Sequence, residues 1–196
     1  MVLGYITFGQ DNGSEMFSDL VGLAKPNKCG SCGFRTDYKQ TNNLFKIKRK
    51  NFDLSYTYDG IAIASLRFKE FCNRNNYNNI LFKELEGSLG FYQMVIQNNL
   101  IPFTANLIED YCDTCSQYRS VVDYGVNTEK LKEPLQDGFY QSDLLFGGRM
   151  GKHDNPLTPI IVIAPDTKEK IQKEGIKNLI FEPIKKNDLT TIAKKH

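Results

Sequence analysis

The chain has 196 residues and a formal net charge of +2, from 25 basic and 23 acidic residues. Hydrophobic residues make up 40% of it and aromatic residues 12%, which is typical of a globular protein with a buried core. This near-neutral balance argues against a dedicated nucleic-acid binder, and no apolar stretch approaches the ~20 residues that span a bilayer. With only two histidines, the chain offers little for histidine-based catalysis.

The start of the chain has no features of a secretion signal. Met1–Phe8 contains no basic residue, and its apolar run is shorter than the core of a signal peptide. We therefore expect a cytoplasmic protein. In that reducing compartment, paired thiols bind metal ions more often than they form disulfides.

The first motif along the chain is Cys29-Gly-Ser-Cys32-Gly33, within residues 26–36. Glycine permits tight backbone turns, and in such a turn the amide groups can point at the two sulfur atoms. The pattern therefore predicts a zinc knuckle, in which two cysteines of one turn share a metal ion.

Residues 44–58 alternate between apolar and polar side chains. Phe45 and Ile47 are separated by a lysine, and aromatic or apolar residues alternate with polar ones again from Phe52 to Tyr58. This period-two pattern on both sides of Arg49-Lys-Asn51 predicts a β-hairpin with one face in water.

Two segments, near residues 60–85 and 159–184, read as diverged copies of one strand–helix–strand unit. Each contains a short apolar run, a charged stretch and a second apolar run, and a shift of 99 positions aligns them. The first run is continuous and rich in isoleucine, which predicts a buried strand. The residues expected at the helix ends are Ser65, Asp166, Asn75-Asn76 and Gly175.

The remaining segments complete the expected fold. Residues 87–103 read as strand and turn that stop at Pro102, whereas recurring glycine and proline predict irregular structure over residues 125–156. The basic end, residues 185–196, is expected to form a short helix or a tail. No linker divides the chain, so we expect residues 1–196 to form a single α+β domain with a mixed sheet, the two strand–helix–strand units and a four-cysteine zinc-knuckle site.

The second cysteine motif is Cys112-Asp-Thr-Cys115, within residues 109–118, where Ser116 stands in place of a trailing glycine. Residues 33–111 separate the two pairs, far more than the ~15–20 residues between the pairs of a compact zinc ribbon. A metal ion held by both pairs would therefore tie distant parts of one domain together.

The two pairs together supply four thiolates, the set that a structural zinc ion prefers. We therefore expect Zn²⁺ with the ligands Cys29, Cys32, Cys112 and Cys115. Iron at the same sulfurs, two redox-active dithiols and two disulfides are the alternatives, because thiolates alone do not select the metal strictly. The fifth cysteine, Cys72, lies among aromatic residues at helical spacing and is predicted to be a small buried core residue.

Several motifs along the chain are similar to those of a known group. The chain resembles bacterial double-CXXCG-motif proteins, which are associated with immunity to polymorphic toxins, over roughly residues 25 to 185. The motifs that carry the resemblance are Cys29-Gly-Ser-Cys-Gly33, Asp53-Leu-Ser-Tyr-Thr-Tyr-Asp-Gly60, Tyr111-Cys-Asp-Thr-Cys115, Ser142-Asp-Leu-Leu-Phe-Gly147 and Gly175-Ile-Lys-Asn-Leu-Ile-Phe-Glu-Pro-Ile184.

The resemblance implies a non-enzymatic cytoplasmic protein that binds and neutralises a cognate toxin domain. It also implies that the four cysteines of the two motifs are metal ligands. Ser116 departs from the pattern, because a second CXXCG motif would have glycine there.

The chain lacks the motifs of familiar catalytic sites. It contains no Gly-x-Ser-x-Gly elbow, no phosphate-binding glycine loop and no His-Glu-x-x-His pair. We therefore expect no catalytic residue, no cofactor beyond the metal, and a protein partner rather than a nucleic acid or a membrane. Glu109, Asp110 and Asp113 form an acidic stretch that can meet a basic toxin, since charge complementarity speeds association.

Two other functions remain open from the sequence. The run Lys46–Lys50, followed by Phe52, Tyr56 and Tyr58, could neutralise phosphates while its aromatic rings stack bases, as in a zinc-containing nucleic-acid-binding module. The two CxxC pairs could instead belong to a thiol-redox enzyme, which needs a cysteine of lowered pKa.

Overall fold

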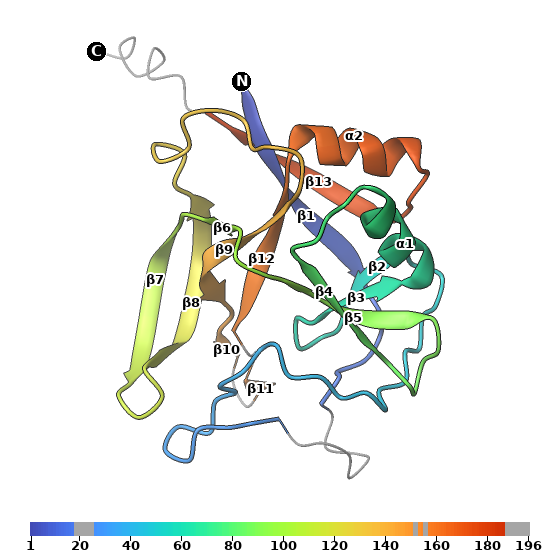
Figure 1. Ribbon diagram of the computed structural model, residues 1–196. Helices are drawn as coiled ribbons and strands as arrows, with labels where there is room; N and C mark the ends of the chain where they lie inside the picture. Colours follow the sequence, from blue (N-terminus) through green and yellow to red (C-terminus); the bar gives the residue numbers. More distant parts are fainter. Residues whose placement is uncertain (18–25, 151–152, 155–156, 187–196) are drawn as a thin grey trace, which may run out of the picture.

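The structure, a computed structural model, describes residues 1–17, 26–150, 153–154 and 157–186 (Figure 1). Over these ranges it is an α+β protein in which strands predominate. Its elements in chain order are β1 (Val2–Asp11), β2 (Leu54–Tyr56), β3 (Ala62–Ser65), α1 (Leu66–Arg74), β4 (Ile80–Glu84), β5 (Phe91–Ile96), β6 (Leu100–Ile101), β7 (Phe103–Cys112), β8 (Gln117–Val126), β9 (Phe139–Phe146), β10 (Arg149–Met150), β11 (His153–Asp154), β12 (Thr158–Ile163), α2 (Pro165–Lys173) and β13 (Leu179–Lys185).

Strand β1 joins two halves of a curled mixed sheet. It pairs antiparallel with β13 from Val2 to Gly9, and Tyr5 and Ile6 also pair antiparallel with β12. Its last two residues pair parallel with β2. The described residues thus form a nine-stranded sheet in the order β4-β5-β3-β2-β1-β12-β9-β6, with β13 beside β1. The apolar segment at the start of the given sequence is therefore a central strand of the sheet.

The two segments that the sequence identified as similar are each built of strand, helix and strand. Strands β3 and β4 are both antiparallel to β5, which lies between them, and β12 and β13 are both antiparallel to β1. Helices α1 and α2 have nine residues each, and their bounds differ by the predicted shift of 99 positions. A common origin of the two segments stays a prediction.

The helix ends follow local chemistry in most respects. Ser65 caps α1, and its hydroxyl accepts a hydrogen bond from the backbone N–H of Phe68 at 3.2 Å. Asn76 and Gly175 follow the two helices with φ of 58° and 69°, as predicted. The predicted cap Asp166 is wrong: it lies inside the first turn of α2, because Pro165 already begins the helix.

Both faces of the sheet are buried around β12. Ile161 and Ile163 pack in one cluster with α1 and α2, whereas Val162 packs in a second cluster on the other face. Side chains alternate between the faces of a strand, so a strand covered on both sides needs an unbroken apolar run. This explains the run Ile160–Ala164 and confirms the prediction of a buried strand.

The predicted hairpin over residues 44–58 is wrong. Phe45 and Ile47 are buried and the lysines between and after them are exposed, but residues 44–53 form no strand. Of the predicted second arm, β2 is a strand, but it pairs with β1 and β3 instead of with residues 44–50. The backbone N–H of Ile47 donates to the hydroxyl of Ser88 at 2.8 Å instead of to a neighbouring strand. Alternating burial therefore reports only that one side of the segment packs on the core.

Residues 125–156 are irregular only in part: residues 127–138 form no helix or strand, as predicted, but β9 follows them and pairs with both β12 and β6. The eight residues of β9 contain no glycine; Gly138 and Gly147 flank the strand and mark its ends. Of the predicted basic tail, Lys185 ends β13 and residues 187–196 lie outside the described part of the chain. Neither helix in the described ranges has the length and apolar character to cross a membrane.

Candidate metal centre

The first knuckle is a turn held by its own backbone. The N–H of Cys29 donates to the carbonyl oxygen of Phe34 at 2.9 Å, and the N–H of Gly33 donates to that of Cys29 at 2.8 Å. Gly33 has a φ of 73°, in the left-handed region that glycine adopts without strain. The prediction that the trailing glycine serves a tight turn is therefore confirmed.

The second knuckle is the tip of the β7–β8 hairpin. The two strands pair in register from Phe103–Val126 to Cys112–Gln117. The N–H of Ser116 donates to the carbonyl oxygen of Cys112 at 2.8 Å, and its φ is 55°. Serine here adopts the conformation that glycine adopts in the first knuckle, so both cysteine pairs occupy the same kind of turn.

This shared turn predicts opposite effects for a matched pair of substitutions. Gly33→Ala is expected to destabilise the protein by about 1 kcal/mol, because a side chain in the left-handed region is strained. No other atom lies within 4 Å of the added Cβ, so backbone strain alone is tested. Ser116→Gly is expected to leave stability unchanged or slightly higher. Thermal unfolding measures both; an equal loss in the two variants would contradict the shared turn.

The fold brings all four predicted ligands together. Their sulfur atoms lie within 4.8 Å of one another, with Cys29 and Cys112 3.9 Å apart and Cys32 and Cys115 3.8 Å apart. A tetrahedral site with metal–sulfur bonds of about 2.3 Å has sulfur–sulfur edges of about 3.8 Å. All five cysteines are free thiols, and these separations exceed the ~2.05 Å of a disulfide. The cluster can therefore hold a single metal ion.

The turns also prepare two of the sulfurs to bind a cation. Backbone N–H groups of Cys32 and Ser31 lower the pKa of Cys29, and the N–H of Cys115 lowers the pKa of Cys112 to about 6. Burial raises the pKa of Cys115 to about 12. Metal ions bind the thiolate rather than the thiol, so the first cysteine of each knuckle is set to bind.

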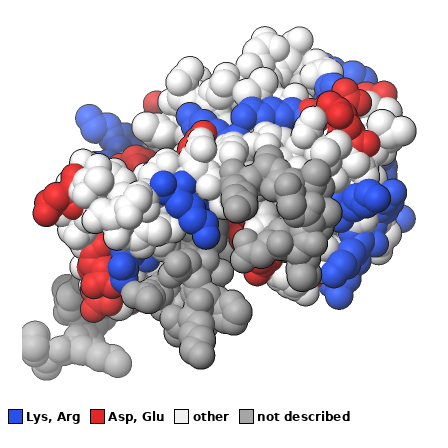
Figure 2. Space-filling model, turned by 90° about the horizontal axis from the view of Figure 1, so that it is seen from below, with Lys and Arg blue, Asp and Glu red and all other residues white. Residues whose placement is uncertain are grey.

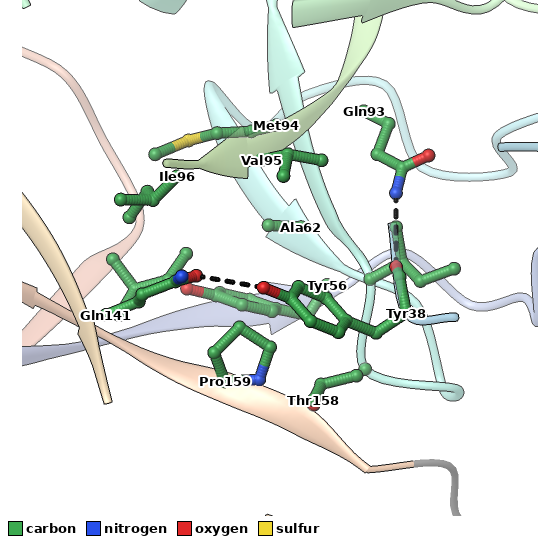
Figure 3. Close-up of a pocket in the computed structure, with 13 residues that line it drawn as sticks. Tyr38, Tyr56, Ala62, Gln93, Met94, Val95, Ile96, Gln141, Thr158 and Pro159 are labelled. Carbon is green, nitrogen blue, oxygen red and sulfur yellow. Dashed lines mark hydrogen bonds between the residues drawn. The ribbon is translucent and has the colours of Figure 1, made fainter. Parts of the chain in front are cut away.

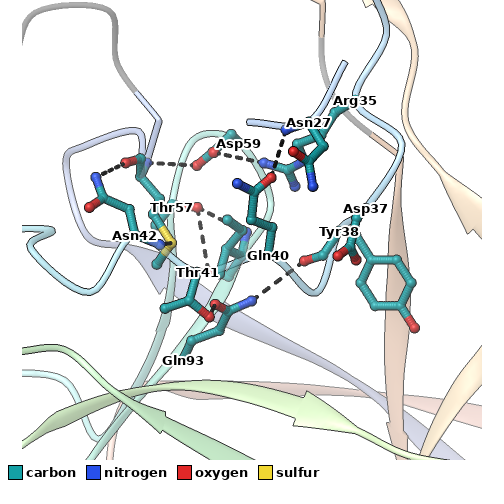
Figure 4. A network of polar contacts seen from close by, with 12 residues as sticks. Asn27, Arg35, Asp37, Tyr38, Gln40, Thr41, Asn42, Thr57, Asp59 and Gln93 are labelled. Carbon is teal, nitrogen blue, oxygen red and sulfur yellow. Dashed lines mark hydrogen bonds and ion pairs between the residues drawn. The ribbon is translucent and has the colours of Figure 1, made fainter. Parts of the chain in front are cut away.

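Neighbouring side chains attach the first knuckle to the body of the protein (Figure 4). The guanidinium of Arg35 donates to the carboxylate of Asp59 at 3.1 Å, and only 5% and 11% of these side chains are exposed. The other carboxylate oxygen accepts from the backbone N–H of Met16 at 2.9 Å. Phe34 is buried in the core cluster that also contains Phe103 of β7. The knuckle is thus held by a buried ion pair on one side and by apolar packing on the other.

The segment after the first knuckle crosses a small cleft between the two halves of the sheet (Figure 3). The hydroxyl of Tyr38 lies 3.4 Å from the side-chain oxygen of Gln141 in β9. The side-chain amide of Gln93 in β5 donates to the backbone oxygen of Tyr38 at 3.5 Å. The cleft has a volume of about 30 Å³, room for about two water molecules. A cleft of this size does not admit a substrate.

An open groove of about 410 Å³ lies directly beside the cysteines. In it, Asp110 accepts a hydrogen bond from the guanidinium of Arg119 at 3.1 Å. The groove is lined by Ser31, Cys32, Asp110, Tyr111, Cys112, Asp113, Thr114 and Arg119. Four thiolates would fill every position of a tetrahedral ion, so an ion held by these cysteines would have no open position for a substrate in the groove.

No family model and no curated protein matches the chain. Within the described ranges, the four cysteines are the group that offers ligand atoms close enough together for one metal ion.

The other predicted sites have mixed outcomes. Cys72 is fully buried in α1, and burial raises its pKa, as expected of a core residue. The basic side chains of Lys46–Lys50 are exposed, but this run itself forms no strand, and Arg49 pairs with Asp11. Seen from below, basic side chains form separate groups among white and red surface (Figure 2). Nucleic-acid binding thus stays an untested alternative without its predicted platform.

Two features of the site are not among the predictions from the sequence. One is the long β7–β8 hairpin, although Ala105–Tyr111 and Tyr118–Tyr124 flank the second motif with several β-branched and aromatic residues. The ion pair of Arg35 and Asp59 joins residues 24 positions apart, and nothing local marks it.

Proposed function

We propose that this protein binds another protein through the β7–β8 hairpin and has no catalytic activity of its own. The observation that carries the proposal is the exposure of β7, where six consecutive residues, 106–111, lie at the surface. Three of them are large and apolar: Leu107, Ile108 and Tyr111 are 42%, 43% and 52% exposed. Because side chains alternate along a strand, Leu107 and Tyr111 project from one face of the hairpin and Ile108 from the other. Exposed large apolar side chains concentrated on one element mark a candidate interaction site.

The metal would serve this function by holding the tip of the hairpin. Our proposal is a structural Zn²⁺ bound by Cys29, Cys32, Cys112 and Cys115, because a closed tetrahedral set of thiolates suits zinc. Iron also accepts this geometry and is the alternative to be tested. With its tip clamped to the first knuckle, the hairpin would meet a partner as a rigid element.

The resemblance to double-CXXCG-motif proteins extends the proposal to the kind of partner. By that analogy, the bound protein would be a toxin domain, which this chain neutralises by covering a surface the toxin needs. The acidic residues near the hairpin tip support a basic partner.

The metal is tested first on the purified protein. Elemental analysis is expected to give one zinc per chain and no iron, with no visible absorption from an iron–thiolate centre. Rapid alkylation of Cys29 or Cys112 in the metal-loaded protein would instead favour the thiol-redox alternative, because metal-bound thiolates are shielded.

Binding is tested by affinity capture of the tagged protein from lysate of its source, followed by reconstitution with the purified partner. The hairpin variant Leu107→Ser is expected to lose the partner, whereas Leu89→Ser, at an apolar residue that is 79% exposed elsewhere, should retain it. Toxin neutralisation predicts that the partner alone stops growth and that co-expression restores it. Equal capture by both variants would contradict binding through the hairpin.

A further inference from the structure

The outer edge of β7 is free for pairing. In the described part of the chain β7 pairs only with β8, and the other edge of β8 bridges to Gly147 through Val121. Figure 1 shows β7 as the outermost strand of the hairpin, with β8 between it and the rest of the protein. A long unpaired edge offers backbone N–H and C=O groups as a template for another strand.

The hairpin differs in charge from the rest of the chain. Residues 103–126 contain four acidic residues and one arginine, although the whole chain has a net charge of +2. The arginine, Arg119, already pairs with Asp110. Glu109 and Asp113 are exposed near the tip. An approaching partner therefore meets a locally negative surface, which favours basic groups.

Aromatic side chains near the tip also suit a basic partner. Tyr111 on β7 and Tyr118 on β8 are direct cross-strand neighbours, with ring centroids 4.9 Å apart. They are 52% and 42% exposed. Lysine and arginine bind over the faces of such rings, and the attraction adds to that of the nearby carboxylates.

We propose that the free edge of β7 binds an extended segment of another protein that carries lysine or arginine side chains. This inference rests on the proposed function and specifies its partner. The segment adds as a strand beside residues 106–111, where backbone pairing supplies affinity. Its apolar side chains contact Leu107 and Ile108, and its basic side chains reach Glu109, Asp113 and the two tyrosines.

A second copy of this chain fits the same edge less well. Two copies paired through β7 would place Glu109 and Asp110 of one beside those of the other, and like charges on adjacent strands are destabilising. The same negative charge favours a basic partner over a second copy. A hairpin held at its tip would also lose little conformational freedom on binding either one.

The test uses a displayed library of random twelve-residue peptides, selected on the metal-loaded protein. Peptides rich in lysine or arginine together with β-branched residues are expected to enrich. Their affinity should fall about tenfold in Leu107→Ser and in Tyr111→Ser, as for central interface residues, and remain unchanged in Leu89→Ser. Raising the salt concentration should weaken binding, because it screens exposed charges. Metal content and melting temperature verify that each variant is folded.

Hydrogen exchange provides a second readout that does not depend on substitutions. A bound peptide is expected to protect amides of residues 104–111 on the outer edge. Glu109→Lys should shift selection toward less basic peptides. Peptides that bind equally well to all variants, without protecting β7, would overturn this inference but leave protein binding intact. No enrichment of any peptide, together with no captured partner, would overturn both proposals.

Discussion

Replacing Cys29 with serine is expected to abolish stoichiometric metal binding and to lower the melting temperature by roughly 10 °C or more. A structural ion that loses one of four thiolates binds far more weakly, because the remaining three leave its coordination incomplete. An ion bound at these sulfurs would join residues 83 positions apart, so its loss would free the hairpin tip from the first knuckle. Elemental analysis and thermal unfolding measure the two effects, and Cys112→Ser should reproduce them.

Cys72→Ser is the matched control for these variants. It also removes a buried thiol, but Cys72 is in α1 and outside the four-sulfur cluster. The control is expected to lose some stability and keep its full metal content. Unchanged metal content and melting in both Cys29→Ser and Cys112→Ser would refute the metal centre.

Asp59→Ala is expected to destabilise the protein by about 3–5 kcal/mol, the usual effect of breaking a buried ion pair from one side. The substitution leaves the guanidinium of Arg35, whose side chain is 5% exposed, without its carboxylate. It also removes the acceptor of the Met16 N–H. Because Arg35 is in the first knuckle, we expect metal affinity to fall as well. Chemical denaturation and competition with a chelator measure the two changes.

The exposed ion pair of Arg49 and Asp11 provides the comparison. Its side chains are 53% and 46% exposed, so Asp11→Ala should change stability by less than about 1 kcal/mol. The double variant Arg35→Met, Asp59→Leu should be more stable than Asp59→Ala, since no buried charge is left unpaired. Equal effects of Asp59→Ala and Asp11→Ala would show that the buried pair does not anchor the knuckle.

Local sequence patterns predicted the parts of the fold that depend on local chemistry. Ser65 was recognised as a helix cap and Gly175 as a helix end, because capping and left-handed turns involve only neighbouring residues. The hairpin expected over residues 44–58 failed for the opposite reason. Alternating burial is produced equally well by a strand and by an irregular segment lying on a core, and only the presence of a pairing partner distinguishes them.

The candidate metal centre also has parts that depend on local sequence and parts that depend on long-range contacts. Each CxxC pair is local, and the conformation of the first turn follows from its glycine. The second turn was less predictable, since Ser116 adopts a left-handed conformation that serine seldom occupies. The meeting of the two pairs depends on the β7–β8 pairing and on the packing of Phe34, which are long-range interactions.

The sequence by itself determined the ligand types, the first turn and the strand–helix–strand order of two segments, because these follow from residues close together in the chain. Only the tertiary structure decided that the four sulfurs converge, that β1 is central, and that β7 is an exposed edge. Those properties depend on which strands pair across tens of residues. Such pairings are selected by the burial of the whole core and not by any one segment.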